Sequence, residues 1–168
     1  QIHVIDSESA SCGETQIALK LMELEEKGLP FEEIVRQIEV FRSNVHTYFV
    51  LDNLETLRKN GRLSSVKALV ASTLSIKPVM AGDKGVIVQR GQSIGIKKAL
   101  GKMADMVVSE APDAKNRILM ISHCNALKRA EFVRDMIMEK AAFQRTVIMD
   151  TRGVSSMYAN DGGVIVTV

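Results

Sequence analysis

The sequence predicts an α+β fold, with helices layered on a six-stranded sheet that is mixed and largely antiparallel. Six short β-prone runs follow residue 46, helical stretches separate some of them, and 46% of the 168 residues are hydrophobic, enough for one core. Residues 1–45 indicate one strand and two helices, and a lone strand leaves its backbone groups unpaired. We therefore expect that these residues are left over from a truncated parallel-sheet domain, or that a partner supplies the neighbouring strands.

The first part of the chain predicts a strand, a turn and two helices. Residues 2–5 form a β-prone run, and a turn rich in small residues follows. Apolar residues then recur at helical spacing up to Gly28, which can end the helix in a left-handed conformation. The next helix begins after Pro30, because acidic residues in the first turn suit the positive end of the helix dipole: Glu32 and Glu33.

The middle of the chain begins with a strand at residues 46–51, HTYFVL, which are mostly aromatic and β-branched. A short helix up to Gly61 follows, and a second short helix is predicted for residues 63–74. The segment IKPVMAGDKGVIVQ predicts a hairpin that turns at residues 82–85. An amphipathic helix is expected over residues 93–109.

The last part of the chain predicts three strands, RILMIS, TVIMDT and GGVIVTV. A helix over residues 125–140 connects the first two. The segment RGVSSMYANDGG lies before the last strand, and its glycine, asparagine and aspartate residues favour a polar surface turn.

Composition excludes several function classes. A net charge of +2 and an aromatic fraction of 4% argue against a nucleic-acid partner. No run of about 18 apolar residues predicts a membrane span. The two cysteines, Cys12 and Cys124, lie far apart in sequence, which favours free thiols in a reducing cytoplasm.

The segment DSESASCGET is the first candidate site. Serine hydroxyls and free amides at a strand-to-helix turn suit a carboxylate or another anion, and we select Ser7, Ser11 and Gly13. The alternative is helix capping, in which Ser9 or Ser11 satisfies the first turn of the helix.

A second polar cluster lies near the end of the chain and supplies Tyr158, Asn160, Asp161 and Gly162. Two cations flank the apolar stretch between residues 62 and 77 and suit an amphiphile with an anionic head: Arg62 and Lys77. Their alternatives are structural, since Arg62 can cap helix carbonyls and Lys77 can lie on a strand edge.

A cysteine and a histidine meet where a strand ends, at His123 and Cys124, and such a pair suggests nucleophilic catalysis. Neighbours at a strand end point to opposite sides of the sheet, however, and neither residue has a visible third partner. We therefore favour a histidine that is hydrogen-bonded within its loop. The spacing of cysteine and histidine predicts no metal site.

The order and spacing of four segments resemble the DegV family of bacterial fatty-acid-binding proteins. These segments are VIDSESASCGET, YFVLDNLETLRKNGRL, LSIKPVM and IGIKKALGKM, which cover most of residues 2–103. The strand that ends at His123 and the glycine-rich last strand extend the resemblance to the end of the chain. The resemblance implies two domains, with residues 1–45 as the C-terminal remnant of the N-terminal α/β domain and residues 46–168 as the C-terminal α+β domain.

The resemblance also implies the binding of one long-chain fatty acid in an apolar tunnel between the domains, with no cofactor. In the family a separate kinase phosphorylates the bound carboxylate, so the protein is a carrier and not an enzyme. The missing N-terminal domain of the same protein is then a further expected partner. The tunnel candidates are Phe49, Leu51, Leu54 and Ile76, for which ordinary core packing is an equal alternative.

Two departures from the family pattern bear on the kinase. Many relatives end in a His-x-Gly-Pro-Gly turn near the lipid head, where this sequence has MYANDGG. Many also place an arginine where this sequence has Ile94. Two rival functions stay open: a hydrolase or transferase that uses His123 and Cys124, and a protein-interaction module that recruits a strand to residues 2–6.

Overall fold

The computed structural model of the protein describes residues 1–63 and 75–168. The second short helix predicted for residues 63–74 lies, from residue 64 on, outside the described residues.

The helices and strands follow one another in an order close to the predicted one. A short 3-10 turn at Ala114–Asn116 precedes β4. The elements are α1 (Cys12–Glu26), α2 (Phe31–Arg42), β1 (Thr47–Val50), α3 (Glu55–Lys59), β2 (Ile76–Asp83), β3 (Val86–Ile94), α4 (Ile96–Ser109), β4 (Ile118–His123), α5 (Leu127–Met138), β5 (Arg145–Asp150), α6 (Gly153–Ala159) and β6 (Val164–Thr167).

The six strands form one mixed sheet in the order β3-β2-β1-β6-β4-β5, which confirms the predicted α+β fold. The pair β4–β5 is parallel, and the other four pairs are antiparallel. The predicted hairpin joins β2 and β3, where Asp83 pairs with Val86. Its two loop residues, Lys84 and Gly85, have φ angles of 50° and 76°, as a tight hairpin turn requires.

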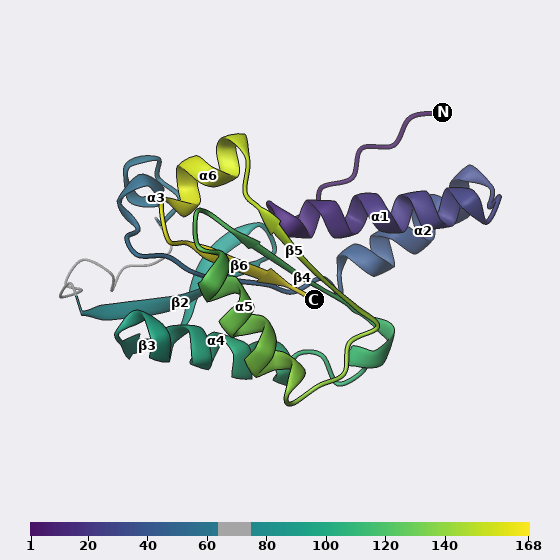
Figure 1. Ribbon diagram of the computed structural model, residues 1–168. Helices are drawn as coiled ribbons and strands as arrows, with labels where there is room; N and C mark the ends of the chain where they lie inside the picture. Colours follow the sequence, from purple (N-terminus) through teal and green to yellow (C-terminus); the bar gives the residue numbers. More distant parts are fainter. Residues whose placement is uncertain (64–74) are drawn as a thin grey trace.

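Helices cover both faces of the sheet (Figure 1). Helices α4 and α5 pack on one face over the main core, which includes Val50, Leu119, Ile121 and Val166. Helix α1 packs on the other face against β4 and β6, and α2 packs on α1. The predicted domain division between residues 45 and 46 stays a prediction.

Two polar side chains anchor α1 on the sheet. Gln16 is 5% exposed, and its Nε2 donates to the backbone oxygens of Ile118 in β4 and Thr167 in β6, both at 2.9 Å. Cys12 is fully buried one turn earlier, with its Sγ 3.0 Å from the Thr167 hydroxyl. The first turn of α1 is therefore fixed above the junction of two strands.

The strand predicted for residues 2–5 is wrong for this structure, because residues 1–10 form neither helix nor strand. Ile2 and Val4 are 93% and 84% exposed, since no described strand lies beside them to pair with their backbone.

The polar turn predicted at RGVSSMYANDGG is in fact a short helix followed by a turn. Helix α6 begins at Gly153, and its last residue, Ala159, is buried with Leu51 and Leu57. Tyr158 packs against the same cluster. Glycine and serine have low helix propensity, so this tertiary packing is what stabilises the helix.

We expect the substitution Gln16→Ala to lower the free energy of unfolding by about 1–3 kcal/mol, because it leaves one buried and one partly buried carbonyl oxygen without their donor. Urea denaturation measures this change. The matched control is Gln144→Ala, since Gln144 is exposed and only its backbone N–H is hydrogen-bonded. Equal stability of the two variants would contradict the anchoring role of Gln16.

Candidate functional site

A cavity of about 630 Å³ opens on the α1 face of the sheet. The loop before α1, the β2–β3 turn, the end of α3 and helix α6 surround it. The lining carries a set of hydroxyl groups, the hydroxyl wall, from Ser9, Ser11 and Thr47, and beside it a set of apolar side chains, the apolar wall, that includes Phe49 and Leu51. The cavity therefore offers both polar and apolar surface, as an amphiphile requires.

The hydroxyl wall belongs to a buried chain of hydrogen bonds that connects the loop to the sheet. Neighbouring Oγ, Oγ1 and Sγ atoms in this chain lie 2.8 to 3.5 Å apart. Its two ends lie on the cavity wall. The six side chains, in order, are Ser11, Ser122, Cys12, Thr167, Thr47 and Ser9.

The serine side chains take part in this network and do not cap the helix, which was the alternative role considered for Ser9 and Ser11. Ser11 occupies the N-cap position of α1, but its side chain makes no capping hydrogen bond. Its Oγ lies instead 2.9 Å from the Ser122 Oγ in β4. The Ser9 Oγ lies 2.8 Å from the Thr47 Oγ1 in β1, so both hydroxyls are positioned by the sheet.

The loop is strained. Glu8 and Ser11 have φ angles of 50° and 58°, a left-handed region that costs a non-glycine residue about 1–2 kcal/mol. Gly13 lies close beneath it, because a Cβ at this position would be 2.0 Å from the Ser9 Oγ and 3.1 Å from the Thr47 Oγ1. The approach of α1 to the loop therefore requires glycine at position 13.

Burial raises the pKa of the Cys12 thiol, and the hydrogen bonds with Thr167 and Ser122 offset only part of this effect. The thiol stays protonated at neutral pH and acts as a member of the hydrogen-bonded chain. It is therefore a poor nucleophile.

Charges gather at the mouth of the cavity. Three acids line it, Asp6, Glu8 and Glu14, and among the described lining residues only Arg62 is basic. Glu8 is neutralised by Arg42 of α2, whose Nη1 lies 2.6 Å from its carboxylate.

The cavity brings together several residues that were selected from the sequence. Ser11, Phe49, Leu51, Arg62 and Tyr158 all line it. Arg62 is exposed at the rim, whereas Tyr158 is half-buried beside the apolar cluster under α6.

The other head-side candidates from the opening segment lie next to the cavity. The Ser7 Oγ donates to the Ser9 backbone oxygen at 3.1 Å, and Gly13 supports Ser9 from below. Their role in the structure is to shape the loop that presents the Ser9 and Ser11 hydroxyls.

The candidates after Tyr158 form the turn behind α6. The Asn160 Oδ1 accepts a hydrogen bond from Thr56 in α3 at 3.2 Å, while Asp161 is exposed. Gly162 is buried with φ at 88°, and a Cβ there would lie 2.2 Å from the Asp52 carboxylate. These three residues are outside the cavity lining.

Three further candidates also lie outside the lining. Lys77 donates to the Asp52 backbone oxygen at 2.6 Å, and Asp52 also pairs with Arg129 at 2.6 Å. Leu54 packs into the cluster under α6, and Ile76 begins strand β2.

The sequence interpretation missed Thr47, Ile165 and the place of Ser9 in the cavity lining. Strand alternation was a usable signal, because Thr47 lies two residues before Phe49 and therefore on the same face of β1. Ile165 pairs directly with Phe49 across the strands. That register could not be derived from the sequence.

His123 and Cys124 point to different parts of the molecule. His123 is 4% exposed, pairs with Val164 of the main core, and accepts a hydrogen bond from the Ala126 N–H at its Nδ1. Cys124 packs instead in the cluster around Leu51. No hydrogen bond or ion pair joins the two side chains in the described structure, in agreement with the opposite orientation predicted for strand neighbours.

Within residues 1–63 and 75–168, no three His, Cys, Asp or Glu side chains gather as a metal ion would require. No helix in the same ranges combines the length and apolar character needed to cross a membrane.

Comparison with known proteins gives the family. The family model described as "Uncharacterised protein, DegV family" matches residues 1–167. The chain belongs to the DegV family. It is similar to a DegV domain-containing protein of Streptococcus gordonii, with 34% identity over 98% of this chain and 58% of the relative. The chain therefore spans about three fifths of the length of the relatives that it matches.

Solved structures of the DegV family share the fold. A protein from Ruminococcus gnavus, refined with vaccenic acid, has 50% identity and a TM-score of 0.96, over 100% of this chain and 60% of that chain. The Fatty Acid Kinase (Fak) B3 protein of Streptococcus pneumoniae, loaded with linoleic acid, has 31% identity and a TM-score of 0.86, over 99% of this chain and 59% of that chain.

We expect Gly13→Ala to destabilise the protein by about 1–3 kcal/mol, because the new methyl group collides with Ser9 and displaces the loop. Thermal or urea unfolding measures the change. The matched control is Gly101→Ala in α4, where the new Cβ meets the flexible end of Met136 at 3.3 Å and alanine favours the helix. A loss at position 101 as large as that at position 13 would contradict the close-approach argument.

We expect the two thiols to react differently in the folded protein. At pH 8 iodoacetamide should modify the half-buried Cys124 and spare Cys12, whose raised pKa and full burial keep it protonated and inaccessible. Both should react after unfolding in guanidinium chloride. Mass spectrometry of the digested protein measures the extent of alkylation at each cysteine. Equal alkylation rates of the two cysteines in the folded state would show that the thiol of Cys12 is exposed.

Proposed function

We propose that the protein binds one long-chain fatty acid, with the acyl tail along the apolar wall of the cavity and the carboxylate at the Ser9 and Ser11 hydroxyls. The observation that carries this proposal is the cavity itself, whose lining combines hydroxyl groups and apolar side chains in one space. The fatty acids named in the related structures support the same class of ligand.

The apolar wall can supply the affinity. Removing one CH₂ group from water contributes about 0.8 kcal/mol, so a buried sixteen-carbon tail gains roughly 10 kcal/mol before the costs of association. A volume of about 630 Å³ lies within the range of small-molecule sites. Tyr158 and Phe49 add aromatic surface to this wall.

The hydrogen-bonded chain can present two donors to one carboxylate. Hydroxyl hydrogens rotate, so in the proposed complex Ser122 turns away from the Cys12 Sγ, to which it donates at 3.5 Å, and donates to Ser11, while Thr47 donates to Ser9. The Cys12 thiol can then donate to Thr167 and Thr167 to Thr47, so that the Ser122–Cys12 contact is the one link without a hydrogen. Both end hydroxyls then have a free O–H for the ligand, and a buried carboxylate keeps its hydrogen bonds.

In this proposal the protein is a cytoplasmic carrier whose bound carboxylate is phosphorylated by a separate kinase. The similarity to the Fatty Acid Kinase (Fak) B3 protein supports this partner. No histidine stands in the segment MYANDGG, so the described chain offers Tyr158 there as a hydrogen-bonding group and no imidazole for phosphoryl transfer. Phosphoryl chemistry is therefore assigned to the kinase.

We expect protein purified from a bacterial host to carry a long-chain acid, which solvent extraction and mass spectrometry would identify. Delipidated protein should bind palmitate with saturation in calorimetry. The absence of both a copurified acid and saturable binding would reject the proposed function.

We expect Ser11→Ala to weaken palmitate binding about tenfold, because a hydrogen bond to a charged group contributes about 1.5 kcal/mol or more. Calorimetric titration measures the change in Kd. The matched control is Ser109→Ala, since the Ser109 hydroxyl is exposed at the end of α4 and donates only to the Met106 backbone oxygen. Unchanged palmitate affinity in the Ser11→Ala variant would show that the carboxylate binds elsewhere.

A further inference from the structure

The loop that carries the two hydroxyls has little support from regular structure. Residues 1–10 form neither helix nor strand, and Glu8 and Ser11 are both held at positive φ. The Glu8 N–H is satisfied locally by the Asp6 carboxylate at 3.1 Å. A strained loop keeps such a conformation only when its surroundings hold it there.

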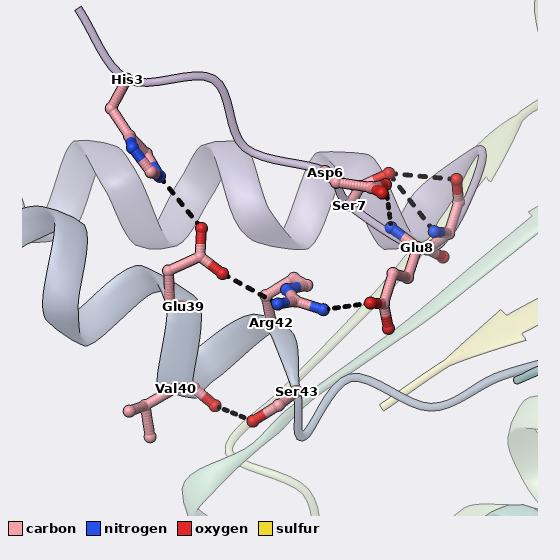
Figure 2. Close-up of polar contacts among 9 residues, drawn as sticks. His3, Asp6, Ser7, Glu8, Glu39, Val40, Arg42 and Ser43 are labelled. Carbon is pink, nitrogen blue, oxygen red and sulfur yellow. Dashed lines mark hydrogen bonds and ion pairs between the residues drawn. The ribbon is translucent and has the colours of Figure 1, made fainter. Parts of the chain in front are cut away.

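Arg42, the last residue of α2, reaches this loop from outside. Its Nη1 lies 2.6 Å from the Glu8 carboxylate, and its Nη2 lies 2.8 Å from the Glu39 carboxylate one turn back in α2. The other Glu39 oxygen lies 3.0 Å from the His3 Nε2. Figure 2 shows these contacts as one continuous line from the N-terminal segment through α2 to the loop.

The guanidinium is fixed in place. The Arg42 side chain is 20% exposed, and its Nε is buried without a hydrogen-bond partner in the described structure. Hydrogen bonds from His3 and Arg42 lower the pKa of Glu39, so this carboxylate stays charged and orients Arg42. Its Nε contributes no hydrogen bond, so the two ion pairs are the polar contacts that a substitution removes.

Side-chain hydrogen bonds also cap the C-terminal end of α2, so Arg42 projects from a rigid turn. The Ser43 Oγ donates to the Val40 backbone oxygen at 2.8 Å, and the Asn44 side chain donates to the same oxygen at 2.7 Å. Five residues after Arg42, Thr47 holds Ser9 from the sheet. Residues 42–47 therefore hold the loop at two points, Glu8 and Ser9.

The charge of Arg42 has a second consequence. Glu8 lines the cavity, and an unpaired carboxylate there would repel an anionic ligand head. The ion pair turns the Glu8 side chain toward α2 (Figure 2) and offsets part of its charge.

We propose that Arg42 is a positioning residue for the fatty-acid head: through Glu8 it holds the loop so that the Ser9 and Ser11 hydroxyls face the cavity. This inference rests on the proposed function. Arg42 is outside the cavity lining, so it acts through the loop and not by contact with the lipid.

The test compares palmitate with methyl palmitate, which has the same tail and no charge. We expect Arg42→Gln, which loses the ion pair and leaves the Glu8 charge unpaired, to weaken palmitate binding about three- to tenfold. Glu8→Gln, which loses the ion pair but also removes that charge, should weaken it by a smaller factor, and the affinity for the ester should change less than about twofold in both variants. Arg42→Lys, which keeps the charge but lacks the planar fork that places one nitrogen on each carboxylate, should fall between the Arg42→Gln variant and the unsubstituted protein. The control Arg36→Gln removes the Arg36–Glu33 ion pair elsewhere on α2 and should change neither affinity.

Amide hydrogen exchange of the lipid-free protein tests the loop directly. We expect faster exchange in the peptide that covers residues 7–12 in the Arg42→Gln and Glu8→Gln variants, with unchanged exchange in α4 and α5. The Arg36→Gln variant should match the unsubstituted protein throughout. Glu8→Gln leaves α2 intact, so it separates loss of the ion pair from damage to the helix.

The outcomes distinguish this inference from the proposed function. If the unsubstituted protein binds no palmitate, the proposed function fails and with it the role of Arg42 toward a lipid. If it binds palmitate and the Arg42 and Glu8 variants bind equally well, or lose palmitate and ester affinity in parallel, only the present inference is overturned. Unchanged exchange in residues 7–12 would also overturn it.

Discussion

The hydrogen-bonded chain between the opening loop and the sheet is the interaction on which the candidate site depends. Its members come from the loop, from α1 and from strands β1, β4 and β6, so it fixes the loop to three strands at once. Each hydrogen bond contributes little alone, but a buried hydroxyl that loses its partner costs about 1–3 kcal/mol. Because its members hold one another in place, the network controls the geometry of the cavity wall.

The two faces of the sheet serve different purposes. The face under α4 and α5 is covered by a continuous, largely apolar core, which stabilises the sheet. On the other face, α1 covers only the β4–β6 side, and the apolar residues of β1 and β3 remain open to the cavity. Because the rigid core lies behind it, this second face can keep an open apolar surface without loss of the fold.

Local patterns in the sequence predicted most of the fold and part of the site. Runs of β-prone residues and turn chemistry predicted the six strands of the sheet and the hairpin at residues 82–85. Phe49 and Leu51, chosen as tunnel candidates from the family resemblance, line the cavity. Helix α6 was missed because tertiary packing of Ala159 stabilises it against weak propensity. The partners of Ser9 and Ser11 are 38 and 111 residues away in sequence, so no local pattern could show that these hydroxyls face the sheet and not the helix end.

The chemistry of the head site bears on what a bound carboxylate could do next. A guanidinium in direct contact would lower the basicity of the carboxylate and slow its departure. Among the described lining residues the one cation is Arg62, at the exposed rim. Arg42 forms an ion pair with Glu8 and is not part of the lining. Neutral hydroxyl donors therefore orient the proposed ligand without neutralising it. A carboxylate held in this way keeps a nucleophilic oxygen, which is the property that transfer of a phosphoryl group to it requires.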